Sequence, residues 1–175
     1  MLENTRLLLR PITTADAPAM AASLADPEVR RLTGTHAHFS PEQIETYCAN
    51  IGADPNRLDL AIVDKRQPNR VVGEISLLDI DRTNRNAHLR IALYGKSLFG
   101  KGYGTEASRL LIQHAFDHEG LHRIDLEVFS FNTRAVALYR KLGFVQEGVK
   151  RQALFWDGAF HDVLLMARLA HPASL

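Results

Sequence analysis

One segment, residues 89–107, constrains the fold of this chain more than any other. It begins as an apolar strand, passes through a loop with glycine at positions 100, 102 and 104, and continues into an amphipathic helix. Glycine lets the backbone approach a ligand closely, and the first turn of a helix presents unpaired N–H groups that suit an anion. The segment therefore predicts a strand–loop–helix unit that holds a phosphate-bearing cofactor.

The identity of that cofactor is open at this point. Gly102–Ala107 fits the G-x-G-x-x-A form of the dinucleotide fingerprint, and Asp125 and Glu127 follow about 20 residues later on the next apparent strand. A doubly wound domain, however, needs several further βα units, and only about 70 residues remain. A turn that binds nothing is a further alternative, which three alternating glycines disfavour. Length thus argues against a nicotinamide-dependent oxidoreductase.

A second segment, Asn132–Phe144, decides between these alternatives. Asn132 is a typical helix N-cap and Gly143 a typical residue just past a helix end, while Tyr139 lies seven residues after Asn132 and so near the same side of the helix. The segment resembles, position by position, the Asn-x-x-Ala-x-x-x-Tyr-x-Lys-x-Gly-Phe pattern of the GCN5-related N-acetyltransferases. The loop Gly100–Thr105 resembles the acetyl-coenzyme A loop of the same family.

The resemblance extends from residue 5 to about residue 169. Thr5–Pro11 and Trp156–Val163 are similar to the subgroup that acetylates ribosomal-protein N-termini and polyamines. The resemblance implies an α/β (α+β) fold with a mixed, mostly antiparallel central sheet and helices on both faces. It also implies acetyl-coenzyme A as cofactor and direct attack by an amine in a ternary complex. A homodimer is compatible with it.

Turn, cap and periodicity signals predict the elements independently. A first helix, capped by Thr13 or Thr14, is expected to about Leu24, with Pro27 ending the run. Further helices are expected from the capping box at Ser40 to about Ile51, and over Thr105–Glu119 and Asn132–Leu142. Strands are expected at Leu7–Pro11, Leu58–Asp64, Val71–Ile80, Ala87–Leu93, Arg123–Phe129, Val145–Ala153 and Asp162–Leu169. We expect one domain over residues 1–170 and a tail at 171–175.

Composition excludes several classes of function. The chain has 46% apolar and 23% charged residues, a net charge of +1 and no basic block suited to nucleic acid. No apolar run approaches membrane-spanning length. Cys48 is the single cysteine, so no intrachain disulfide is expected, and a reducing cytoplasm is the expected compartment. We expect no metal site.

Cofactor binding is expected to rest mainly on backbone. The N–H groups of Lys101, Gly102, Tyr103, Gly104 and Thr105, after Gly100, suit pyrophosphate oxygens, and Lys101 either adds a charge or is simply solvated. Phe99 occupies a position where the family usually has Gln or Arg. The resemblance further implies that the strand ending near Leu93 separates from its neighbour and frees an N–H for the thioester oxygen, and that Asn132 contacts the pantetheine arm.

Tyr139 is the predicted acid for the departing thiolate, because a phenol with a pKa near 10 can stabilise a thiolate with a pKa near 8.5 at small cost. His88 is the leading candidate for the base, since histidine titrates near neutral pH and relatives often carry Glu at this position. Glu74 and Asp79 are alternatives through a water.

The acceptor stays open between a protein N-terminus such as that of a ribosomal protein, a small-molecule amine and a polyamine. The segment Thr33–Ser40, on the expected acceptor side, contains no acid, which disfavours a polyamine. A non-catalytic acyl-coenzyme A-binding module is the alternative from another class, and Tyr139 argues against it.

Overall fold

The computed structural model describes residues 1–68 and 70–170, so the predicted tail at 171–175 lies outside the described residues. Within them, eight strands form one sheet in the order β1-β2-β3-β4-β5-β6-β8-β7. The strands are β1 (Leu2–Glu3), β2 (Leu7–Pro11), β3 (Leu58–Asp64), β4 (Val71–Asp81), β5 (Asn86–Leu93), β6 (Arg123–Phe129), β7 (Val145–Trp156) and β8 (Ala159–Leu169).

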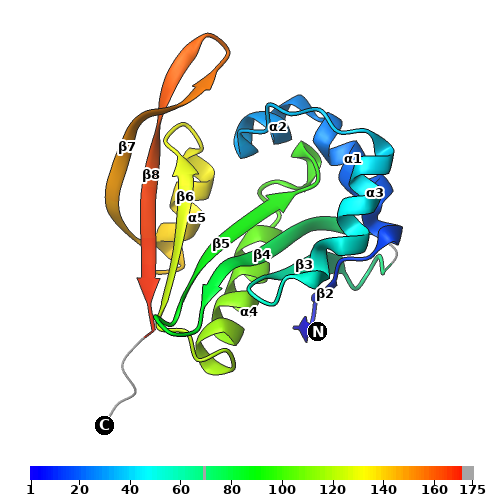
Figure 1. Cartoon of the computed structure of the whole chain (residues 1–175), viewed down its shortest axis with the longest axis horizontal. Helices are drawn as coiled ribbons and strands as arrows, with labels where there is room; N and C mark the ends of the chain where they lie inside the picture. Colours follow the sequence, from blue (N-terminus) through cyan, green and yellow to red (C-terminus); the bar gives the residue numbers. More distant parts are fainter. Residues whose placement is uncertain (69, 171–175) are drawn as a thin grey trace.

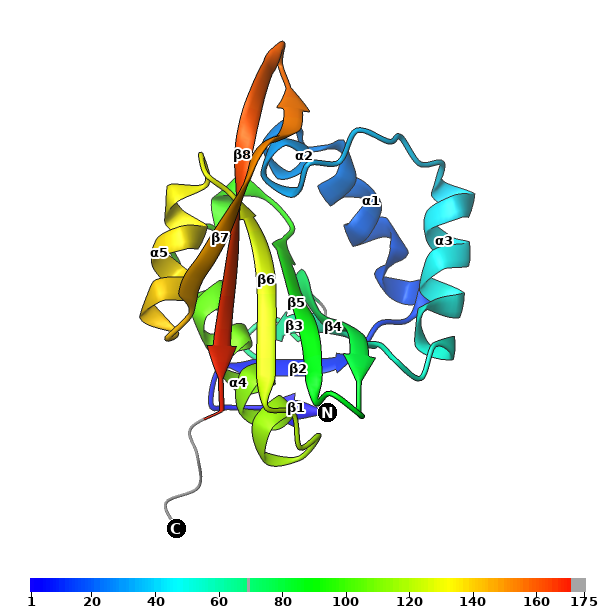
Figure 2. The ribbon, with the colours of Figure 1, turned by 60° about the vertical axis from the view of Figure 1, so that its left-hand side comes forward.

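Helices cover both faces of this sheet, as expected (Figure 2). On one side lie α1 (Ala17–Ala25), α2 (Pro27–Thr33) and α3 (Pro41–Asn50), and on the other α4 (Tyr103–Asp117) and α5 (Thr133–Lys141). The larger core joins α4 and α5 to the sheet through side chains such as Leu111 and Ile124. A smaller core joins α1 and α3 to β3 through Met20, Cys48 and Ala61. No described helix has both the length and the apolar character needed to cross a membrane.

The pairing of β5 with β6 positions the site. It is the one parallel pair among the described strands, and its register ends after three residue pairs, the last being His88 with Asp125. β5 remains paired with β4 as far as Leu93. Figure 1 shows the consequence: β5 and β6 start side by side and diverge toward α2. The predicted separation of the strand ending near Leu93 is thereby confirmed.

Most predicted elements are confirmed, and some bounds are corrected. Ser40 and Gln43 form the predicted capping box of α3, and the Asn132 side chain caps α5 by accepting from the N–H of Ala135 at 3.2 Å. The first predicted helix ends before Pro27, as expected, but the second helix that follows it directly was not predicted. Pro27 begins α2, because the Asp26 side chain caps that helix and a proline at the first helical position sacrifices no hydrogen bond.

Two further differences concern α4 and the chain start. α4 begins at Tyr103 rather than Thr105, since Gly102 adopts a left-handed conformation (φ 86°) as its N-cap. β1 was not expected and pairs with β2 at one edge of the sheet. A doubly wound dinucleotide fold is excluded, because the described strands contain one parallel pair where that fold needs a largely parallel sheet.

Candidate active site

A cavity of about 610 Å³ lies where β5 and β6 diverge. Its walls come from α2, the second half of β5, the glycine loop, the start of α4, the end of β6 and α5. The predicted site residues that line it are His88, Leu93, Gly100, Gly102, Tyr103, Gly104, Thr105, Asn132 and Tyr139. Tertiary structure thus brings together two segments that the sequence separates by about 30 residues, as the strand separation requires.

The glycine loop offers unclaimed backbone donors to this cavity. The first N–H of the α4 region with a backbone acceptor is that of Glu106, bonded to the carbonyl of Gly102 at 3.0 Å. Within the described residues, no hydrogen bond uses an N–H from Gly100 to Thr105. A methyl group at Gly104 would lie 3.1 Å from Leu138 of α5. The loop therefore forms a close-walled cradle with anion-binding character.

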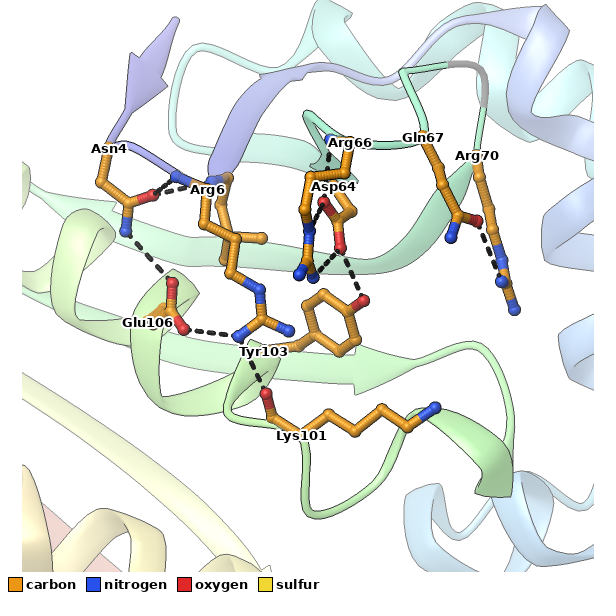
Figure 3. Close-up of polar contacts among 10 residues, drawn as sticks. Asn4, Arg6, Asp64, Arg66, Gln67, Arg70, Lys101, Tyr103 and Glu106 are labelled. Atoms are coloured by element: carbon orange, nitrogen blue, oxygen red, sulfur yellow. Dashed lines mark hydrogen bonds and ion pairs between the residues drawn. The ribbon is translucent and has the colours of Figure 1, made fainter.

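A polar network holds this loop against β2 and β3 (Figure 3). The Tyr103 hydroxyl donates to Asp64 at 2.7 Å, and the Arg6 guanidinium lies 4.3 Å from the centre of the Tyr103 ring. Arg6 also donates to the Lys101 carbonyl at 2.9 Å and to Glu106 at 2.7 Å. The Tyr103 side chain is therefore an anchor, and its backbone N–H is what remains for a ligand.

Asp64 is the buried end of this network. Its side chain is 2% exposed and pairs with Arg66 at 2.7 Å. The Arg66 guanidinium, with the Tyr103 hydroxyl, holds the pKa of the Asp64 carboxyl well below its ordinary value. A charge this deeply buried needs both partners, so the network fixes the position of the loop as well as its own geometry.

The Phe99 side chain, which lines the cavity, is in contact with an arginine. The guanidinium of Arg134, from the first turn of α5, lies 4.0 Å from the centre of the Phe99 ring, and both residues line the cavity. At position 99, where the family usually has Gln or Arg, this chain thus has an aromatic ring that makes a cation–π contact with Arg134. A positive charge is present there, although it comes from another element.

Tyr139 faces the cavity from α5. Its side chain is 6% exposed and packs edge-on against Phe144. Burial raises the pKa of the Tyr139 hydroxyl to about 12, so the phenol is protonated at neutral pH. No hydrogen bond between described residues involves this hydroxyl, which leaves it available as a donor.

His88 lines the cavity at the point where β5 and β6 stop pairing. Its Nδ1 is 2.7 Å from Oδ1 of Asp125 on β6, and its side chain is half-buried. The neighbouring Leu89 is buried in the core on the opposite face, because successive side chains of a strand alternate between its two faces. The contact with Asp125 was missed at sequence level. The parallel register of β5 and β6 would have been the signal, and it cannot be obtained from the local pattern.

Glu74 and Lys101 do not belong to the cavity lining. The Glu74 carboxylate accepts from the Tyr94 hydroxyl at 3.0 Å, and burial raises its pKa. Lys101 is exposed, and its carbonyl is held by Arg6. Asp79 is also exposed and lies in a bulge of β4 with positive φ. Of the three candidates for the base, the structure places only His88 at the cavity.

The separated strand pair and the glycine loop at a helix start are the features that the resemblance to the N-acetyltransferases implied. A family model for the acetyltransferase (GNAT) domain matches residues 6–145. The chain therefore belongs to the GCN5-related N-acetyltransferase family and is an acetyl-coenzyme A-dependent N-acetyltransferase.

Relatives agree with this assignment, and a solved structure shares the fold. An uncharacterized N-acetyltransferase of Bacillus subtilis (YoaA) is 30% identical over 166 residues, which cover 93% of this chain and 92% of that one. A putative ribosomal N-acetyltransferase of the same organism (YdaF) is 27% identical, covering 95% and 92%. The crystal structure of the Vibrio cholerae spermidine N-acetyltransferase in complex with CoA and spermine superposes with a TM-score of 0.85 at 24% identity, covering 95% and 96%.

The residues present fit acetyl-coenzyme A. The N–H groups of the glycine loop that make no hydrogen bond suit pyrophosphate, and Arg134 adds a positive charge to the lining of the same cavity. The edge of β5 that leaves β6 after His88 presents unpaired backbone groups to a pantetheine arm. When bound, this substrate supplies an acetyl group already activated as a thioester.

Proposed function

We propose that this protein transfers an acetyl group from acetyl-coenzyme A to a primary amine. The amine belongs either to the N-terminus of a protein, such as a ribosomal protein, or to a small molecule. One observation carries the proposal: His88 and Tyr139, from β5 and α5, line one cavity together with the glycine loop. The amine attacks the thioester carbon directly, a C–N bond forms and the C–S bond breaks. No covalent intermediate is needed, and Cys48 is buried in the smaller core.

Each proton in this reaction has a proposed partner. His88 accepts the proton that the acceptor ammonium loses, since only the free amine attacks. Tyr139 donates to the departing thiolate sulfur. A backbone N–H near Leu93, on the separated edge of β5, stabilises the negative charge that develops on the thioester oxygen. In this proposal Glu74 has no role in catalysis, because its carboxylate is directed to Tyr94.

The charge of the cavity supports an acceptor with one amine over a polyamine. Among the described residues, the lining carries the cations Arg90, Arg134 and Lys141 against the single carboxylate of Glu127, and Lys150 pairs with that carboxylate. A second ammonium group on the acceptor would therefore meet repulsion and no free acid. Relatives named as spermidine acetyltransferases keep the polyamine as the competing acceptor to test.

We further propose that residues 1–170 are one catalytic domain acting in the cytoplasm. If a homodimer forms, we place its contact on β7, the outer strand of the sheet, which carries the exposed Val145 and Val149. Size-exclusion chromatography tests that part of the proposal. A monomer at all concentrations would remove it without affecting the activity.

The activity is tested by thiol release with a panel of acceptors. Peptides with free N-termini and monoamines should release coenzyme A faster than spermidine does, and N-acetylated peptides should release none. Faster turnover of spermidine would replace the proposed acceptor by a polyamine. Binding of coenzyme A without thiol release from any amine would leave a non-catalytic binding module.

His88→Gln tests the proposed base. It should lower kcat/KM around neutral pH and recover as pH rises, because more of the acceptor is then unprotonated. Equal pH–rate profiles for the variant and the wild type would place the base elsewhere.

A further inference from the structure

The contact between His88 and Asp125 occurs at the end of the segment over which β5 and β6 pair. Nδ1 and Oδ1 lie 2.7 Å apart, and these two residues form the last registered pair before the strands separate. His88 lines the cavity, whereas Asp125 does not. The carboxylate therefore contacts the imidazole from outside the cavity lining.

The contact with Asp125 determines which nitrogen of the His88 imidazole carries the proton. A neutral imidazole has one nitrogen that donates and one that accepts, and an ionised carboxylate can only accept. Contact with Asp125 assigns the proton to Nδ1 and leaves the lone pair on Nε2. Because a base must present a lone pair to the proton it removes, this is the tautomer that the proposed reaction requires.

We propose that Asp125 is a positioning residue that holds His88 in the Nδ1–H tautomer, with Nε2 ready to accept a proton from the acceptor amine. This inference rests on the proposed role of His88 as base. Asp125 itself touches neither the acceptor nor the acetyl group. Its effect on the reaction passes through the orientation and charge of the imidazole.

The charged groups around His88 leave the role of its carboxylate partner to Asp125. On β4 the residue that pairs with His88 is the uncharged Leu78. On β6 Glu127 pairs with Lys150, and Arg123 pairs with Glu147. On β5 itself the next charge on this face is Arg90, two residues along. Among the described residues, Asp125 is the only carboxylate in contact with His88.

A purely structural role is the competing explanation, because a contact at this position could simply clamp the two strands together. Loss of the carboxylate has different effects in the two cases. Loss of a clamp lowers the melting temperature and alters the cavity, whereas loss of a positioning residue lowers kcat and changes the tautomer of the imidazole. Asparagine keeps an oxygen that can accept from Nδ1–H but removes the charge, and alanine removes both.

The experiment compares Asp125→Asn, Asp125→Ala, His88→Gln and the double variant His88→Gln/Asp125→Ala. Glu147→Gln is the matched control, since it also removes a carboxylate from an ion pair of this sheet but lies outside the cavity. Steady-state kinetics with a peptide acceptor give kcat and the KM for acetyl-coenzyme A. Nitrogen-15 NMR of the imidazole reports the tautomer of His88 without any turnover.

We expect Asp125→Ala to lower kcat about tenfold to a hundredfold, less than the 10²–10⁴-fold typical of losing a general base, with the KM for acetyl-coenzyme A unchanged. Asp125→Asn should retain more activity than Asp125→Ala, and Glu147→Gln should match the wild type. In the His88→Gln background Asp125→Ala should cost little more. The Nδ1–H signature of His88 should persist in Asp125→Asn and be lost in Asp125→Ala.

Several results would overturn the inference. A wild-type kcat in Asp125→Ala would do so, and so would an unchanged His88 tautomer in that variant. A loss of kcat on adding Asp125→Ala to His88→Gln that equals its loss in the wild-type background would also do so. A fall in melting temperature with kcat intact would indicate the clamp. If wild-type protein releases no thiol with any amine, the proposed function fails, while the NMR signature still decides whether Asp125 sets the tautomer.

Discussion

Two tyrosines that line the same cavity should respond in opposite ways to loss of their hydroxyl groups. The Tyr139 hydroxyl has no hydrogen-bond partner among the described residues, whereas that of Tyr103 donates to the buried Asp64 at 2.7 Å. Phenylalanine keeps the ring at both positions. The pair Tyr139→Phe and Tyr103→Phe therefore separates chemistry from stability with one identical change of side chain.

The magnitudes follow from these environments. Tyr139→Phe removes a polar group with no protein partner, so the free energy of unfolding should change by less than about 0.5 kcal/mol. Loss of a general acid typically costs 10²–10⁴-fold in rate, or about 3–5 kcal/mol in the activation barrier. The loss should appear in kcat, because the phenol interacts most strongly with the thiolate that forms late in the reaction.

Tyr103→Phe should do the reverse. A hydrogen bond to a charged group contributes about 1.5–3 kcal/mol, and a chain of this size loses roughly 2–4 °C of melting temperature per kcal/mol. The melting temperature should therefore fall by roughly 3–12 °C. The affinity for coenzyme A should weaken because Asp64 no longer restrains the glycine loop, while kcat at saturating cofactor stays near the wild-type value.

The assays are thermal unfolding, coenzyme A titration and thiol release on the same preparations. Activity of Tyr139→Phe within about threefold of wild type would return Tyr139 to a packing role, since that is well short of the range for a lost acid. A large drop in its melting temperature would contradict the absence of a partner for its hydroxyl. An unchanged melting temperature in Tyr103→Phe would refute the anchoring role of the Asp64 contact.

Three further predictions concern the cofactor loop and its supports. Gly104→Ala places a methyl group 3.1 Å from Leu138 of α5, so the Kd for coenzyme A, measured by calorimetry, should rise. Gly52→Ala is the control, because a methyl group there has no neighbour within 4 Å, and it should leave this Kd unchanged. Arg66 and Tyr103 lower the pKa of the Asp64 carboxyl below its ordinary 3.8, so the stability that this carboxylate contributes is complete above that pH and is lost as pH falls through the lowered pKa. Asp64→Asn should therefore destabilise the protein at pH 7 and make its stability depend less on acid pH in denaturant titrations. Equal acid sensitivity of variant and wild type would refute this. Asn132→Ala removes the cap of α5 and should cost about 0.5–2 kcal/mol of unfolding free energy in urea, with Asn132→Asp losing much less.

Local signals sufficed for much of the fold. The strands Leu58–Asp64 and Arg123–Phe129 have the predicted bounds, and the caps at Ser40 and Asn132 act as predicted. Each depends on hydrogen bonds within a few residues or on alternation along one strand. Helix α2 was not predicted, because a proline can follow the end of one helix or begin the next, and only the Asp26 cap shows that a new helix begins.

The sequence by itself determined the glycine loop at a helix start and the capped helix after Asn132, because turn glycines and helix caps are local properties, and the resemblance of Asn132–Phe144 to the acetyltransferase pattern indicated the family. Tertiary structure alone decided which side chains meet. The register of β5 against β6 pairs His88 with Asp125 and then opens the cavity. The same packing directs Glu74 to Tyr94 and leaves Lys101 outside the lining. Contacts between distant strands depend on pairing and twist across the whole sheet, and no local pattern contains that information.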